Sequence, residues 1–138
     1  LGVAGAAAAL EYAIEYVQTR KQFGKPIVEF QAVQLRLADM AIRVEAARLL
    51  LYRAAANAAA GIPSLRDISI AKCYANEIAR EVCANGVQLM GAYGFNKEYG
   101  MEQRLRDSFA WGIGGGTIDI QKINIAAELV GRLFDQRR

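Results

Sequence analysis

Three short segments of this 138-residue chain contain residue types that could bind an anion or a cofactor. The run Gly-Gly-Gly-Thr at 114–117 precedes an apolar helical pattern, and its peptide N–H groups could approach an anionic ligand. Residues 20–24 combine a basic helix end with an aromatic side chain, and Gln88, followed by Gly91, could present an amide. Each segment also has a plainer interpretation: a tight turn, charge matching at a helix C-terminus and a surface helix cap, respectively.

Other kinds of chemistry are excluded by composition. The chain has no histidine, which excludes Ser-His-Asp and Cys-His catalysis and zinc sites with histidine ligands. Cys73 and Cys83 are too few for a four-thiolate metal site, and we expect buried thiols, with a disulfide as the alternative. The net charge of +3 is too small to indicate nucleic-acid binding.

Membrane insertion is not expected either. The longest apolar run, residues 3–10, is far shorter than the ~18 residues that a membrane helix needs. No signal peptide is visible, and we expect a cytoplasmic protein. The chain begins inside an apolar helical pattern and resembles a piece of a longer protein, so the absence of a targeting segment is not informative.

The segments must be positioned by helices. Hydrophobic residues make up 54% of the chain, alanine is abundant and there are only two prolines, a composition typical of packed helices. Apolar residues at helical spacing predict five helices, at 3–19, 28–60, 64–90, 101–110 and 118–134. We therefore expect an all-α fold, an up-and-down bundle of four main helices with a short extra helix.

Helix ends and buried faces are also predicted. Ser64 and Thr117 are expected as N-caps, and Gly61 as the C-cap of the second helix. Arg20 and Lys21 are expected in the last turn of the first helix, and residues 91–94 as a turn. The expected core stripe of the second helix is Val33, Leu37, Met40, Ala41, Val44, Ala47, Leu51 and Ala54.

Several motifs follow one another in a specific order. Residues 20–34 read R-K-Q-F-G-K-P-I-x-x-F-Q-A-V-Q, with L-A-D-M at 37–40. V-Q-L-M-G-A-Y-G-F stands at 87–95, E-Y at 98–99, R-L-R-D at 104–107 and G-T-I-D-I-Q at 116–121. In order and spacing these motifs closely resemble the acyl-CoA dehydrogenase family, with Gly100 where the family usually has proline.

The resemblance implies that residues 1–138 form the C-terminal helical domain of such an enzyme, without its N-terminal helical domain and middle β-domain. The family oxidises the Cα–Cβ bond of an acyl-CoA to a trans-2-enoyl-CoA, in fatty acid metabolism. A carboxylate removes the α-proton while the β-hydrogen leaves as hydride to the flavin of FAD. The implied partners are an acyl-CoA substrate and an electron-transferring flavoprotein.

The resemblance also implies that FAD lies between the subunits of a homodimer or homotetramer. Arg20 would pair with the pyrophosphate of the neighbouring subunit's FAD, a contact that guanidinium makes well. The other residues expected to contact that FAD are Gln22, Phe23, Phe30, Gln31, Gln88, Leu89, Gly91 and Ala92. Thr117 and Asp119 would contact the FAD of their own subunit, and Gly116 would lie near the substrate thioester.

One position departs from the family pattern. Gly115 stands where the family usually has its catalytic glutamate, and glycine cannot abstract a proton. Three hypotheses follow: a base upstream of Leu1, a non-catalytic subunit or assembly module of a heteromeric dehydrogenase, or a different flavin reaction. Asp119 and Glu128 are poor substitutes, because one lies in the capping turn and the other nearly three turns further along the helix.

Overall fold

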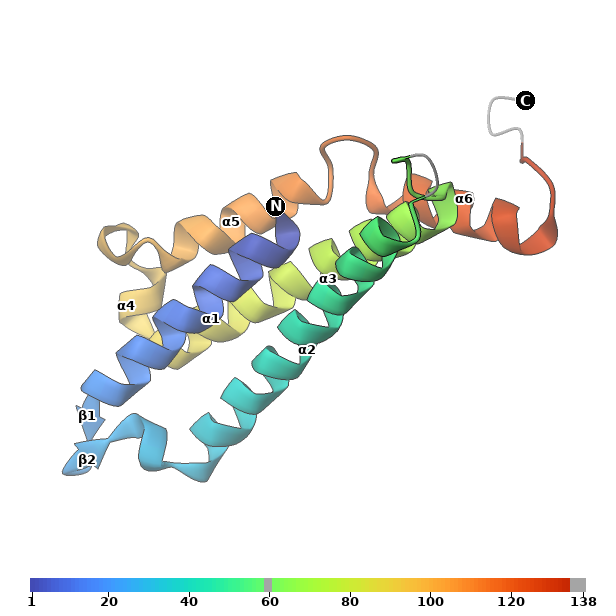
Figure 1. Ribbon diagram of the computed structural model, residues 1–138. Coiled ribbons are helices and arrows are strands. Elements are labelled where there is room, and N and C mark those ends of the chain that lie inside the picture. Colours follow the sequence, from blue (N-terminus) through green and yellow to red (C-terminus); the bar gives the residue numbers. More distant parts are fainter. Residues whose placement is uncertain (59–60, 135–138) are drawn as a thin grey trace.

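The computed structural model describes residues 1–58 and 61–134, which form helices with one very small sheet (Figure 1). The α-helices are α1 (Gly2–Thr19), α2 (Gln31–Ala56), α3 (Leu65–Met90), α4 (Ala92–Phe95), α5 (Met101–Trp111) and α6 (Ile118–Val130). Two 3-10 turns, η1 (Ile27–Glu29) and η2 (Lys97–Tyr99), and two paired strands, β1 (Lys21–Gln22) and β2 (Lys25–Pro26), connect them. The predicted all-α fold with four main helices and a shorter fifth is confirmed.

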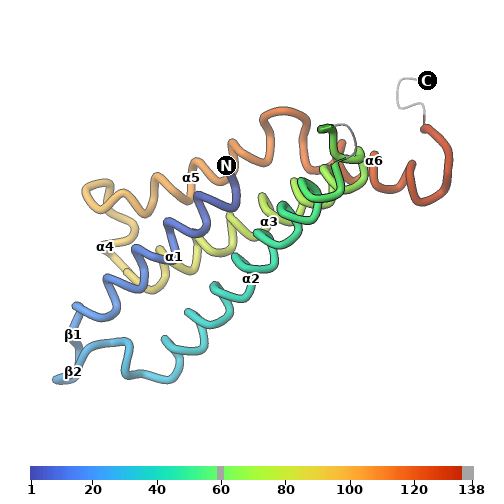
Figure 2. The backbone as a smooth tube through the Cα atoms, in the orientation of Figure 1, coloured from blue at the N-terminus to red at the C-terminus, as the bar shows by residue number. Residues whose placement is uncertain are grey.

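Helix α3 organises the other elements. It packs against α1, α2, α5 and α6. The tube in Figure 2 shows the hairpin of β1 and β2 near one end of the molecule and α6 at the opposite end. The two ends of α3 therefore carry different surroundings, and these are the regions where the candidate site residues lie.

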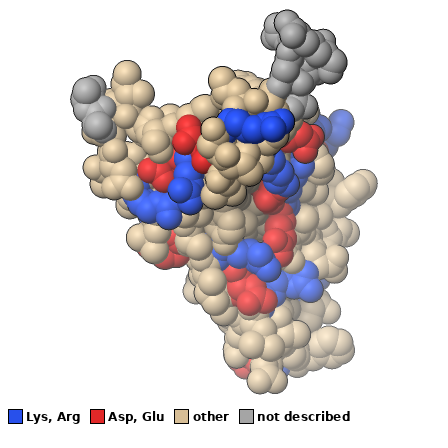
Figure 3. Space-filling model, turned by 90° about the vertical axis from the view of Figure 1, so that its right-hand side faces the viewer, with Lys and Arg blue, Asp and Glu red and all other residues tan. Residues whose placement is uncertain are grey.

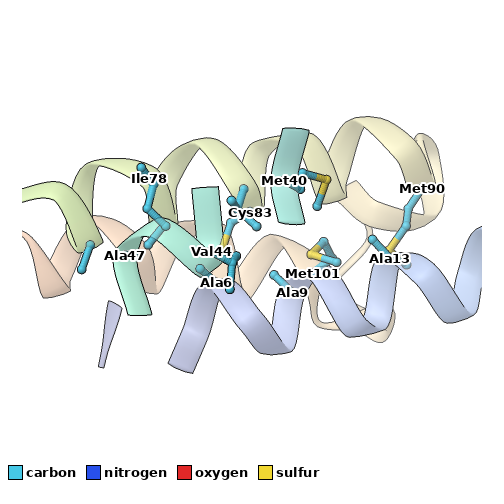
Figure 4. Close-up of a cluster of buried hydrophobic side chains, with 13 residues drawn as sticks. Ala6, Ala9, Ala13, Met40, Val44, Ala47, Ile78, Cys83, Met90 and Met101 are labelled. Atoms are coloured by element: carbon cyan, nitrogen blue, oxygen red, sulfur yellow. The ribbon is translucent and has the colours of Figure 1, made fainter. Parts of the chain in front are cut away.

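The core lies where α1, α2, α3 and α5 meet. Alanines at 6, 9 and 13 of α1 face larger side chains such as Met40 of α2 and Met101 of α5, which are both fully buried (Figure 4). Small residues on α1 let the helices approach closely, and the methionines fill the space that remains. Burial of one such large side chain stabilises the fold by roughly 1.5–3 kcal/mol.

Helix α2 is shorter than predicted at both ends. It begins at Gln31 rather than 28, because η1 precedes it and Phe30 has extended backbone as the N-cap. It ends at Ala56 with Asn57 as its C-cap, so Gly61 does not have the predicted capping role. The predicted extension is thus wrong for 57 and 58, while 59 and 60 lie outside the described residues.

Other predicted ends are corrected in a similar way. Helix α1 ends at Thr19, so Arg20 is its C-cap and Lys21 lies in β1 rather than in the last helical turn. Residues 92–95 form the short helix α4 instead of a simple turn. Helix α6 ends at Val130, four residues before the predicted end, with a left-handed Gly131 as its C-cap.

The predicted N-caps are confirmed. The backbone N–H of Asp67 donates to Ser64 Oγ over 3.1 Å, and that of Ile120 donates to Thr117 Oγ1 over 3.4 Å. The two cysteines are free and buried, as expected. In the predicted α2 stripe, four members are buried, whereas Ala41 and Leu51 are exposed because the buried face is narrower than the apolar face.

Charged side chains of both signs are interspersed on the face shown in Figure 3. Arg43 of α2 pairs with Glu81 of α3 over 3.0 Å, and Lys122 of α6 pairs with Glu77 of α3 over 2.5 Å. Solvent and salt screen such exposed pairs, so they contribute less to stability than the core does. Among the described residues, no helix combines the length and the apolar character required to span a membrane.

Candidate functional site

The first candidate region, here called the Arg20 groove, lies at the C-terminal end of α3. It is a cleft of about 260 Å³ between the ends of α1 and α3, β1, η1 and α4. Its lining residues are Tyr16, Arg20, Gln22, Ile27, Gln88, Leu89, Met90, Gly91, Ala92 and Tyr93. Six residues that the sequence predicted as FAD contacts therefore meet in one cleft, although they come from segments far apart in the chain.

Arg20 is held by the end of α1. Its backbone N–H donates to Tyr16 O, and its carbonyl accepts from Ile27 N–H, each over 2.8 Å. The centre of the guanidinium lies 5.3 Å from the centre of the Tyr93 ring, a cation–π distance. Within the described part of the chain, no carboxylate lies at ion-pair distance from Arg20. The guanidinium therefore keeps its donors for an anionic group.

Aromatic rings form one wall of the groove. The Tyr93 ring lies 6.2 Å from that of Tyr16 and 5.0 Å from that of Tyr99. The Tyr16 hydroxyl donates to Met90 O over 3.4 Å, and burial raises the pKa of Tyr16. These rings fix the groove wall and the orientation of Arg20.

The end of α3 supplies the opposite wall. Gln88 is exposed in the last turn of the helix, so its amide is accessible from the groove. Gly91 follows with a positive φ of 59°, which lets the chain turn directly into α4. Because Gly91 has no side chain, a ligand can approach the backbone here. Together with Arg20, this wall suits a phosphate-bearing ligand.

Three predicted FAD contacts lie beside the groove rather than in its lining. Phe23 is at the hairpin tip, 91% exposed, and its ring centre lies 6.0 Å from that of Phe30. Phe23 has a φ of 52°, which is uncommon for a residue with a bulky side chain. Gln31 is exposed as the first residue of α2. All three residues belong to the hairpin side of the groove.

The second candidate region is the connection between α5 and α6, here called the glycine turn (residues 114–117). Lys72 of α3 donates to three consecutive carbonyl oxygens of this turn, those of Gly114, Gly115 and Gly116, over 2.7, 2.6 and 2.7 Å. Sequence reasoning missed Lys72. A lysine between Ala71 and Ala75, on the otherwise apolar side of α3, was the signal that could have revealed it.

A buried pair supports the same turn from inside the fold. Ser69 Oγ donates to Gln121 Oε1 over 2.9 Å, and Gln121 Nε2 donates to Gly116 O over 3.4 Å. Ser69 and Gln121 are 0% and 7% exposed. The turn is thus held by hydrogen bonds to two different helices.

These bonds determine where the peptide donors of the turn point. In a trans peptide the C=O and the following N–H point in opposite directions. Because the carbonyls of 114, 115 and 116 face Lys72, the N–H groups of 115, 116 and 117 face away from α3. Because the carbonyls converge on one atom, the N–H groups behind them diverge, so each one could donate separately to an oxygen atom that carries negative charge.

No carboxylate belongs to the glycine turn itself. Gly115, at the family's glutamate position, offers only backbone, and Asp119 is exposed in the first turn of α6. An apolar cavity of about 380 Å³ adjoins the turn at Gly114. Its walls include Val3, Leu51, Ala75 and Trp111.

The predicted residues around Arg20 and Gln88 lie far from those of the glycine turn. Lys72 and Gln88 lie on the same helix, and at ~1.5 Å rise per residue they are separated by roughly 24 Å. The Arg20 groove and the glycine turn are therefore two separate regions of one chain.

Comparisons with known proteins agree on one family. The sequence model described as "Acyl-CoA dehydrogenase, C-terminal domain" matches residues 1–130. A relative from Acetobacterium woodii, the caffeyl-CoA reductase-Etf complex subunit CarC, is 44% identical over 135 residues. The match covers 94% of this chain and 36% of CarC.

Solved structures show the same relationship. Butyryl-CoA dehydrogenase from Megasphaera elsdenii has a TM-score of 0.90 and 39% identity, over 94% of this chain and 34% of that protein. The FAD complex of PigA has a TM-score of 0.86 and 37% identity, over the same shares of the two chains. The chain thus spans about a third of the length of these proteins. The resemblance seen in the motifs is confirmed, and the chain belongs to the C-terminal domain family of the acyl-CoA dehydrogenases, which are flavoprotein oxidoreductases.

Proposed function

We propose that this chain is the C-terminal domain of an FAD-dependent acyl-CoA dehydrogenase that oxidises an acyl-CoA to a trans-2-enoyl-CoA. The N-terminal helical domain and middle β-domain would belong to the rest of the protein. The observation that carries the proposal is the Arg20 groove, where a guanidinium, an exposed amide and an open glycine meet. Membership in the acyl-CoA dehydrogenase family supports the reaction class.

The residues of the groove fit a dinucleotide. Arg20 would bind the pyrophosphate, because a guanidinium donates charge-assisted hydrogen bonds to phosphate oxygens. Gln88 and the backbone at Gly91 and Ala92 would approach the adjoining ribose. When bound, FAD supplies the acceptor for the β-hydride. The FAD complex of PigA, a structural relative, supports this cofactor.

The glycine turn would bind the substrate end. One of its outward N–H groups would donate to the thioester oxygen, and Thr117 and Asp119 would contact the FAD of their own subunit. Hydrogen bonds to a carbonyl oxygen stabilise the charge that develops there as the α-proton leaves. The absence of side chains at 114–116 leaves space for branched or cyclic acyl groups.

The catalytic base must come from outside the glycine turn. We propose a carboxylate on the segment that precedes Leu1, near the substrate carbon. A second candidate is a subunit of a heteromeric complex, in which another subunit supplies the carboxylate. The name of CarC, a subunit of a caffeyl-CoA reductase-Etf complex, supports an electron-transferring flavoprotein as partner. A glutamate within about two turns before Leu1 would distinguish the first candidate from the second.

Helix α2 offers a surface for subunit contacts. Leu35, Ile42 and Leu49 recur at every seventh position and are 61%, 67% and 58% exposed. Residues seven apart lie on the same helix face, so they form an apolar stripe opposite the buried one. This stripe supports a homodimer or homotetramer in which the helices of this domain face each other.

The test uses the complete protein with FAD. An acyl-CoA panel with an artificial electron acceptor should reveal dehydrogenase activity, while this chain alone should neither retain FAD nor turn over. Replacement R20A should weaken FAD binding by roughly 10- to 150-fold, since a hydrogen bond to a charged group contributes about 1.5–3 kcal/mol. K21A, at the neighbouring exposed position, is the matched control. Unchanged FAD affinity in R20A would contradict the proposed role of the groove.

A further inference from the structure

We propose that Lys72 is a positioning residue that fixes and polarises the glycine turn, so that an outward N–H group of the turn binds an oxygen atom on which negative charge develops. This inference rests on the proposed function, and it assigns a role to a residue that the sequence motifs do not include. The observation that carries it is the contact of one ammonium with three consecutive peptide carbonyls.

The geometry uses the full donor capacity of the lysine. An ammonium has three N–H donors and no acceptor, and each of the three carbonyl oxygens lies within 2.7 Å of Nζ. Across residues 1–58 and 61–134, no carboxylate lies at ion-pair distance from Lys72. Its charge is therefore directed at the peptide groups of the turn rather than at an acidic side chain.

The positive charge of Lys72 also affects the N–H group on the opposite side of each peptide. A hydrogen bond to a peptide C=O polarises the group and makes its N–H a stronger donor. The peptides whose carbonyls contact Lys72 are the same peptides whose N–H groups belong to 115, 116 and 117. Lys72 thus places a positive charge behind three donors that face away from the bundle.

The glycines fit this arrangement. Gly115 and Gly116 have φ of 67° and 92°, a backbone region that side chains rarely adopt. A Cβ at 115 would lie 3.3 Å from Lys72 Nζ, and one at 116 would lie 2.8 Å from Gln121 Nε2. Glycine meets both conditions without strain: a positive φ and close neighbours at the place where a Cβ would lie.

The fold of the turn does not depend on Lys72 alone. The buried Ser69–Gln121 pair also binds Gly116 O, and Thr117 caps α6. Replacement of the lysine should therefore weaken the donors without removing the turn.

The experiment measures the C=O stretching frequency of a thioester bound to the complete FAD-loaded protein. The first ligand is butyryl-CoA labelled with ¹³C at the thioester carbonyl. The second is the acyl-CoA of the panel that binds most tightly, labelled in the same way. In wild type, binding should lower the C=O stretching frequency. In K72M the frequency should return toward the unbound value, and thioester affinity should fall about tenfold, or ~1.4 kcal/mol, while affinity for free CoA stays unchanged. K122M, on the α6 side and paired with Glu77, should behave as wild type.

The outcomes separate the two proposals. If no acyl-CoA of the panel binds to wild type, the proposed function is wrong. If thioesters bind to wild type and K72M shows the same frequency and affinity, only the role of Lys72 is wrong. If K72M does not fold, K72Q decides, because glutamine keeps an N–H donor but not the charge. A frequency shifted toward the unbound value in K72Q supports the role, and a wild-type frequency overturns it.

Discussion

The two ends of α3 carry candidate binding regions that present different kinds of chemical groups. At the C-terminal end, the Arg20 groove presents side chains: a half-buried guanidinium, an exposed amide and aromatic rings. At the other end, the glycine turn presents backbone donors that are held from behind by Lys72 and Gln121. A site built from side chains should lose affinity one residue at a time. A site built from backbone should depend on the conformation of the whole turn.

The largest effect should come from a side chain inserted into the glycine turn. G116A should lower the free energy of unfolding by about 2–4 kcal/mol, because alanine is strained at positive φ and its Cβ would meet Gln121 Nε2 at 2.8 Å. The matched control is G114A, where the nearest atom to a Cβ is 3.6 Å away. Chemical denaturation measures both, and equal stability of the two variants would show that the turn is not conformationally restricted.

The difference between the Arg20 groove and the glycine turn also explains what could be predicted from the sequence. The glycines and the N-cap Thr117 are local signals, so the turn and the start of α6 were predicted correctly. Lys72 was missed because it lies 42 residues before Gly114, and helical periodicity does not reveal which element a side chain will face. The motif residues of the groove were predicted from resemblance, and the structure brings most of them together. Their roles toward FAD remain predictions.

Other errors have equally simple physical causes. The hairpin was missed because strands of two residues have no detectable alternation. The exposed stripe of α2 was not predicted, since apolar spacing on a helix does not say which apolar face finds a partner within the same chain. Exposed apolar residues of that kind point to contacts with other subunits or domains.

A second prediction concerns the middle of α3, between the two ends. Burial raises the pKa of Cys83 from 9.0 to about 11. Between these values the unfolded chain has lost the thiol proton while the folded chain retains it, so rising pH favours unfolding. At ~1.4 kcal/mol per pKa unit, the loss of stability across this window is on the order of 2 kcal/mol.

The control for this prediction is C83A. Burial also raises the pKa of Cys73 and of Tyr16, so both groups add to the dependence in the same direction. The quantity to compare between wild type and C83A is therefore the pH dependence of the free energy of unfolding, measured by denaturation from pH 8 to pH 11. An identical slope in both proteins would show that the pKa of Cys83 is the same in the folded and the unfolded chain, which would contradict the raised value in the middle of α3.

The smallest effect should come from the exposed amide of the groove. Q88A should leave stability unchanged within about 0.5 kcal/mol, because surface substitutions away from special features rarely cost more. It should weaken FAD binding to the complete protein by roughly 2- to 13-fold, the equivalent of one neutral hydrogen bond of about 0.5–1.5 kcal/mol. Q103A, at an exposed position of α5, should change neither quantity. If Q88A instead destabilises the fold as strongly as G116A, the groove is as conformationally constrained as the glycine turn, and the difference between the two ends of α3 disappears.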